Sequence, residues 1–173
     1  LGLSNTANTF YTSLLYLAWV VKPLWSPFVD ILGTRRRWAW VTQLVMALAL
    51  LGVAWRLPLP GMLPWTLAFF WLIAFVSATH DIAADGYYML ALDPSRQALF
   101  VGVRTLFYRL SAMFASGLFL LWAGRLVERS GGPAPGWSHA IAGLAGLILV
   151  LGVWHSVSLP RPSNDRAGEA RHV

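Results

Sequence analysis

Cysteine is absent from the 173-residue chain, and charged residues make up only 12% of it. Without cysteine there can be no disulfide framework, no thiolate nucleophile and no thiolate metal site. The charged fraction is about half that of ordinary soluble domains, while hydrophobic residues reach 57% and the mean hydropathy is +0.59. This composition argues against a soluble globule, an intrinsically disordered chain and a coiled coil.

Long apolar runs divide the chain. Runs of about 18 or more nearly uncharged residues predict membrane-spanning helices. We expect an all-α bundle over residues 1–158, and Pro23 and Pro27 should kink its first span. Residues 159–173 are polar and mixed in charge, which predicts a disordered tail or the start of a loop between two bundles. The five expected spans are residues 9–29, 38–55, 64–90, 98–124 and 138–158.

The net charge is +6, but the basic residues lie beside the apolar runs and form no continuous basic face. A nucleic-acid partner is therefore disfavoured. If loops alternate between the two sides of a membrane, one side holds seven arginines and the other holds three. The positive-inside rule then places the C-terminus in the cytoplasm and the N-terminus outside. An external start without a leader predicts that a preceding helix is missing.

Several ionisable side chains lie inside the expected spans. Each ionised group near the bilayer centre costs several kcal/mol, so such groups should be paired and functional. Asp81 and Asp85 are four residues apart and share one helix face. In a regular hairpin about Ser95, Asp81 lies level with Arg109, and Asp85 lies level with Arg104. The sequence thus predicts two ion pairs at two depths. The ionisable residues of interest inside the spans are Lys22, His80, Asp81, Asp85, Arg104 and Arg109.

These charges have structural as well as functional interpretations. The pair of Asp85 and Arg104 is equally compatible with a staple between helices. The deeper Asp81 and Arg109 favour a water-filled pathway. Lys22 is near the end of its span, where it either snorkels to the interface or attracts an anionic substrate group.

His80 has three interpretations. A lone intramembrane histidine is more often a hydrogen-bonded packing residue than a proton relay. Together with Asp85 it also has the H-x4-D spacing of glycerolipid acyltransferases, which keeps a membrane-embedded lipid-modifying enzyme as an alternative. His80, Asp81 and Asp85 could supply three metal ligands, but the nearby arginines argue against a metal site. A five-helix scaffold without a substrate is the remaining alternative.

Three segments resemble a known transporter family. Residues 22–30, followed by Gly33 and residues 35–38, are similar to the end of the second helix and the next loop of major facilitator transporters. Within that family, the muropeptide permease and acetyl-coenzyme A transporter branch is the most similar. Residues 78–87 resemble the fourth-helix signature of this branch, and residues 107–110 resemble its Tyr-Arg element in the fifth helix. His80 stands where the permease pattern has glutamine, and Ile31 replaces a basic residue of the loop.

The resemblance implies a role for each of these segments. The chain would be helices two to six of a twelve-helix carrier in a bacterial inner membrane, without the first helix and the C-terminal bundle. Such a carrier works by alternating access, driven here by protons, on a small polar or anionic solute such as a muropeptide, peptide, sugar or siderophore. It needs no cofactor and no catalytic residue. The implied solute and proton pathway comprises Asp81, Asp85, Arg109, Arg104, His80, Tyr108 and Lys22, and the implied cytoplasmic gating loop comprises Asp30, Gly33, Arg35, Arg36 and Arg37.

Overall fold

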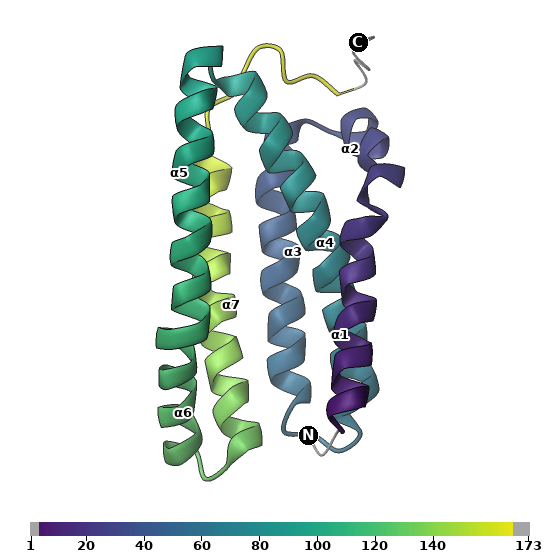
Figure 1. Ribbon diagram of the computed structural model, residues 1–173, viewed down its shortest axis with the longest axis vertical. Helices are drawn as coiled ribbons and strands as arrows, with labels where there is room; N and C mark the ends of the chain where they lie inside the picture. Colours follow the sequence, from purple (N-terminus) through teal and green to yellow (C-terminus); the bar gives the residue numbers. More distant parts are fainter. Residues whose placement is uncertain (1–3, 168–173) are drawn as a thin grey trace.

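The computed structural model describes residues 4–167, and its elements are all helical within that range (Figure 1). The predictions for residues 1–3 and 168–173 lie outside the described residues. The elements in chain order are α1 (Asn5–Val20), the 3-10 turn η1 (Lys22–Leu24), α2 (Ser26–Leu32), α3 (Arg35–Arg56), α4 (Met62–Ala91), α5 (Pro94–Met113), the π segment η2 (Phe114–Leu118), α6 (Phe119–Arg129) and α7 (Pro133–Ser158).

The predicted all-α membrane fold is confirmed. Four helical stretches are long and apolar enough to cross a membrane, namely α3, α4, the 36-residue run Pro94–Arg129 and α7. A fifth candidate combines α1 and η1 with α2, which are bent by 60° relative to each other. Pro23 lies in η1 and Pro27 in the first turn of α2, so the predicted kink is found where proline removes backbone donors.

The fourth span differs from its expected form in two respects. The fourth span starts at Pro94 rather than at residue 98, because proline is tolerated in the first helical turn, where its missing N–H has no intrahelical acceptor. The same span also contains the π segment η2. Such a segment inserts one residue into the helical ladder, and the uninterrupted apolar pattern around it gives no sign of its position.

Helix α3 lies at the centre of the bundle, against α4 on one side and α7 on the other. Helix α1 packs against α4, and helix α6 packs against α7. The buried side chains are mostly alanines, and Val53 is the largest that is fully enclosed. Small residues let membrane helices approach closely. Gly143 shows this directly, because a Cβ atom there would lie 2.3 Å from the Trp122 ring.

The expected regular hairpin of α4 and α5 forms only near its turn. Helix α5 has no buried residue, and its contact with α4 is slight compared with the contact between α3 and α4.

Residues 159–167, for which the sequence predicts a disordered tail, contact the helical bundle. Asp165 accepts hydrogen bonds from two backbone N–H groups of α3, and the Tyr87 hydroxyl donates to the Pro160 carbonyl. Polar groups of this segment therefore bind at helix ends, where backbone donors and acceptors lack intrahelical partners.

Candidate functional site

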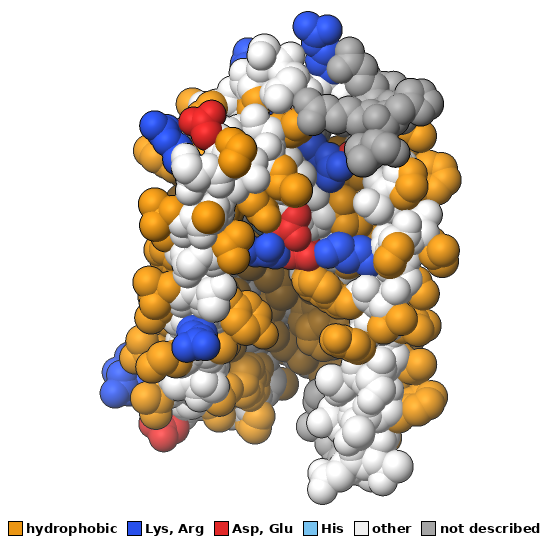
Figure 2. Space-filling model, turned by 45° about the horizontal axis from the view of Figure 1, so that its top comes forward, with side chains coloured by type: hydrophobic (Ala, Val, Ile, Leu, Met, Phe, Trp, Pro, Cys, Tyr) orange, Lys and Arg blue, Asp and Glu red, His pale blue; other side chains and the backbone are white. Residues whose placement is uncertain are grey.

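A cluster of four charged side chains joins η1, α4 and α5 in the middle of the apolar bundle. Asp81 on α4 forms ion pairs with Lys22 through Oδ2 and with Arg104 through Oδ1, the latter at 2.8 Å. Arg104 also forms an ion pair with Asp85 at 2.5 Å. Figure 2 shows these charges as a band across one face, with hydrophobic side chains around it and a hollow beneath it. We call Lys22, Asp81, Asp85 and Arg104 the charge cluster.

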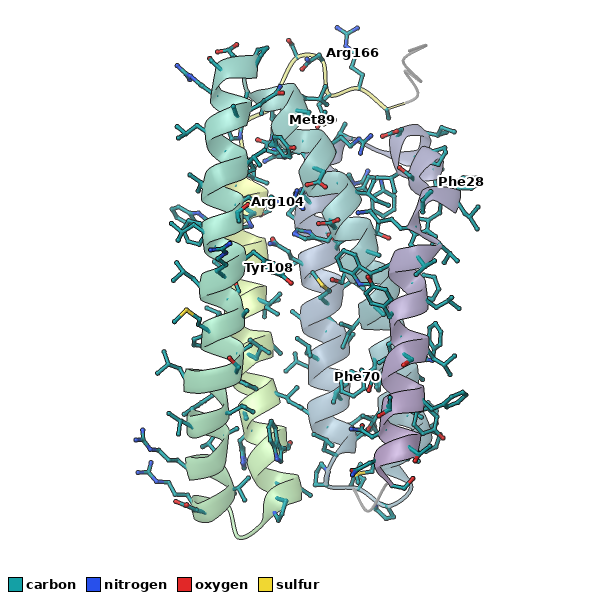
Figure 3. The ribbon with its side chains drawn as sticks, in the orientation of Figure 1. Phe28, Phe70, Met89, Arg104, Tyr108 and Arg166 are labelled. Carbon is teal, nitrogen blue, oxygen red and sulfur yellow. The ribbon has the colours of Figure 1, made fainter. Side chains whose placement is uncertain are left out.

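Local structure explains how the charge cluster assembles. The spacing of four residues puts Asp81 and Asp85 on one face of α4. The bend after α1 brings Lys22 to that face, and Arg104 reaches it from α5 (Figure 3). The side chains of Asp81 and Lys22 are 23% and 25% exposed. Two cations balance two carboxylates, which limits the cost of placing charge among apolar helices.

The predicted pairing is confirmed for Asp85 with Arg104 and wrong for Asp81 with Arg109. Arg104 and Arg109 are five residues apart, which rotates them about 140° around the helix and separates them by about 7.5 Å along it. They cannot both face α4. Arg109 is exposed and makes no hydrogen bond or ion pair with any residue from 4 to 167. Its neighbour Tyr108 on α5 is 76% exposed (Figure 3).

His80 faces away from the charge cluster and into the bundle. Its Nδ1 atom lies 2.9 Å from Thr42 Oγ1 on α3. Because Thr42 donates its own hydroxyl hydrogen to the Trp38 carbonyl, it accepts a hydrogen bond from His80. This is the packing role expected of a lone intramembrane histidine. The position follows from the step of about 100° between His80 and Asp81 around α4.

Sequence reasoning missed a second polar contact beside His80. His155 on α7 donates from Nδ1 to Gln43 Oε1 on α3 over 2.8 Å. Both histidines and Gln43 line a cavity of about 860 Å³ between α3, α4, α7 and the tail. The signal that could have revealed it was the presence of single polar residues, Gln43 and His155, in otherwise apolar spans.

The loop between α2 and α3 brings together Asp30 and Arg35, two residues of the implied gate. They form an ion pair, and Arg35 Nη1 also donates to the Ile82 carbonyl of α4 at 2.9 Å. A Cβ atom at Gly86 would lie 2.4 Å from Arg35 Nη1. Glycine at this position therefore lets the guanidinium lie against α4. Gly33 has an extended backbone and leaves room for the Trp38 ring.

The other two arginines of the loop do not join this ion pair. Arg36 donates from Nε to the Leu159 carbonyl at 2.8 Å and from Nη2 to the Ser156 carbonyl, at the end of α7. Arg37 is exposed, and its backbone N–H is capped by Thr34 Oγ1 at 3.2 Å. Between residues 4 and 167, no group of three or more histidine or acidic side chains is arranged to hold a metal ion.

Comparison with known proteins finds transporters. The chain is 32% identical over 120 residues to the anhydromuropeptide permeases of Escherichia coli strains K12 and O157:H7, which covers 66% of this chain and 24% of each permease. It is 36% identical over 84 residues to the putative transporter AmpG 3 of Rickettsia prowazekii strain Madrid E, which covers 43% of this chain and 20% of that protein. The matched regions thus span about a quarter or less of each relative's length. No protein-family model and no solved structure matches the chain.

These findings agree at a coarse level with the resemblance seen in the sequence. The chain has several helices that are long and apolar enough to cross a membrane, and its relatives are named permeases and transporters. Two of these relatives are anhydromuropeptide permeases, and the three segments resemble the muropeptide permease branch.

Proposed function

We propose that this chain is part of a secondary active transporter of the major facilitator type, and that the charge cluster lines its solute pathway. The observation that carries the proposal is the balanced group of two carboxylates and two cations between apolar helices. Ionisable groups inside membrane spans typically mark ion or substrate pathways. The solute would be small and polar or anionic, such as a muropeptide-like compound, in keeping with the permease relatives.

Alternating access would be driven by protonation of Asp81. This carboxylate has two cationic partners, Lys22 and Arg104, and its neutralisation leaves the cluster with one positive charge in excess. An uncompensated charge in an apolar setting is costly. Protonation therefore favours either a rearrangement of the helices or the arrival of an anionic solute group. Asp85 is the second candidate, because Arg104 holds both carboxylates.

The exposed residues of α5 complete the proposed pathway. Tyr108 lies four residues after Arg104, on the same face of α5, and would line the pathway beside the charge cluster. Arg109 would need an anionic partner from the solute or from the rest of the complete protein. Asp30 and Arg35 would form the gate at the cytoplasmic end, with charge pairs that break and reform as the carrier changes conformation. The C-terminus of the chain would then lie in the cytoplasm.

The test is uptake of labelled anhydromuropeptide by cells that carry the complete protein. We expect Asp81→Asn to lower uptake at least tenfold, because the variant cannot exchange a proton with its cationic partners. The matched control is Asp93→Asn, since Asp93 is 77% exposed in the α4–α5 turn. Both variants should reach the membrane in equal amounts. Unchanged uptake by Asp81→Asn would remove this carboxylate from the mechanism.

The lipid-modifying enzyme finds no support in the geometry. His80 binds Thr42 on α3, whereas Asp85 binds Arg104 on α5. Five residues separate the two along α4, which turns them about 140° apart. They do not converge on one substrate atom as acyl transfer requires. The same contacts offer no observation that favours a scaffold without a solute.

A further inference from the structure

The tail segment that follows α7 is tied to the start of α3. Asp165 Oδ1 accepts the N–H of Arg35 at 2.7 Å, and Oδ2 accepts the N–H of Arg36 at 2.9 Å. These are the first two N–H groups of α3, which have no intrahelical acceptor. A carboxylate there also compensates the positive end of the helix dipole. Both oxygens of one side chain thus cap a helix that lies about 130 residues earlier in the chain.

A second set of contacts runs in the opposite direction. Arg36, at the start of α3, donates to the carbonyls of Ser156 and Leu159 at the end of α7. A cation suits this position, because the last carbonyls of a helix carry its negative partial charge. The Tyr87 hydroxyl on α4 donates to the Pro160 carbonyl at 3.0 Å. The segment 159–165 is therefore held at both ends, by Arg36 and Tyr87 at one and by Asp165 at the other.

This segment forms one wall of a cavity. The space of about 860 Å³ is lined on one side by residues 159–164 and on the other by α3, α4 and α7, with one residue from α5. Its inner wall carries His80, Gln43 and His155. The Nδ1 atom of each imidazole is already hydrogen-bonded to α3.

We propose that residues 159–165 form a strap that gates this cavity, with Asp165 as its latch. When the latch is closed, the strap separates His80 and His155 from the aqueous side at which the tail lies. When Asp165 leaves the α3 amides, residues 161–165 swing away and the cavity fills with water. Residues 159–165 form no hydrogen bond or ion pair with the charge cluster among the described residues, so the device is distinct from that part of the proposed solute pathway.

The latch is coupled to the α2–α3 loop. The two amides that bind Asp165 belong to Arg35 and Arg36, and the Arg35 side chain binds Asp30 and the Ile82 carbonyl. A movement of this loop relative to α4 displaces both amides together. The strap therefore opens when the loop moves, and the cavity exchanges its contents in only one arrangement of the loop.

The absence of cysteine from this chain makes the strap testable by thiol labelling. A single cysteine introduced as Ala84→Cys places a thiol in the wall of the cavity, since Ala84 lines it. The complete protein, with any cysteines elsewhere replaced, is purified in detergent and treated with a charged methanethiosulfonate reagent. We expect Asp165→Ala to raise the labelling rate about tenfold or more, because it removes two charge-assisted hydrogen bonds. Asp165→Asn, which retains one acceptor oxygen, should give an intermediate rate.

Two controls make the result decisive. Asp93→Asn changes an exposed acidic residue outside the strap and should leave the rate unchanged. Ser95→Cys, in the exposed α4–α5 turn, reports the rate for a freely accessible thiol. The proposal is overturned if Ala84→Cys is labelled as fast as Ser95→Cys in the parent, because the cavity would then be open. It is also overturned if Asp165→Ala leaves labelling of Ala84→Cys unchanged. Neither readout depends on transport, so a failure here is distinct from a failure of the proposed function.

Discussion

Replacement of Gly86 by alanine should destabilise the protein, against the usual effect of this change in a helix. A Cβ atom at this position would lie 2.4 to 2.8 Å from three atoms of the Arg35 guanidinium. Because that group ends a flexible side chain, it can swing away, and the cost is that of the contacts it leaves. These are the bond to the Ile82 carbonyl at 2.9 Å and the ion pair with Asp30.

The magnitude follows from three contributions. A hydrogen bond from a charged donor contributes about 1.5–3 kcal/mol. The ion pair with Asp30 is partly exposed, with side chains 21% and 34% accessible, so it adds only about 0–1 kcal/mol. Alanine is favoured over glycine in a helix by about 1 kcal/mol. The balance is a net loss of about 0.5–3 kcal/mol for Gly86→Ala.

The assay is thermal unfolding of the complete protein in detergent, with Gly102→Ala as the matched control. Gly102 lies in α5, and a Cβ atom added there would meet no neighbouring side chain within 4 Å, so its replacement should raise the melting temperature or leave it unchanged. Gly86→Ala should lower it by a few degrees. When Arg35 is already replaced by glutamine, Gly86→Ala should no longer destabilise the protein. A Gly86→Ala protein as stable as Gly102→Ala would refute the placement of Arg35 against α4.

Two further predictions concern the packing of the bundle. Arg104→Gln should loosen α5 from α4, because Arg104 supplies ion pairs to both Asp81 and Asp85; a spin label on each helix should report a broader distance distribution, and an unchanged distribution would contradict the bridge. Gly143→Val should lower stability by about 1–3 kcal/mol through overpacking against Trp122, whereas Gly146→Ala, which meets nothing within 4 Å, should be neutral. Equal melting temperatures for these two variants would count against the close contact of α6 and α7.

Local sequence was sufficient for most of the fold. Apolar runs located the five spans, and Pro23 and Pro27 located the bend, because both signals depend on neighbouring residues only. The spacing of Asp81 and Asp85 likewise placed both carboxylates on one face of α4. Asp85 and Arg104 lie at similar distances from the turn that connects α4 and α5, and this position predicted their ion pair.

Contacts that depend on how the helices pack against one another could not be predicted from the sequence. Equal distance from Ser95 suggested that Arg109 would meet Asp81, but α5 leaves α4 beyond the turn and its rotation turns Arg109 outward. Lys22 takes the place of that partner because the bend after α1 carries it to α4. The docking of Asp165 was unpredictable for another reason, since its partners are backbone N–H groups, which leave no trace in side-chain identity.

The most direct test of the account separates proton coupling from solute binding. The complete protein is reconstituted in vesicles, and two rates are measured with labelled anhydromuropeptide: uptake driven by a pH gradient, and exchange between labelled and unlabelled solute without a gradient. If Asp81 is the group that carries the proton, Asp81→Asn should lose the gradient-driven uptake and retain exchange. Gradient-driven uptake at the parental rate in Asp81→Asn would contradict the central claim.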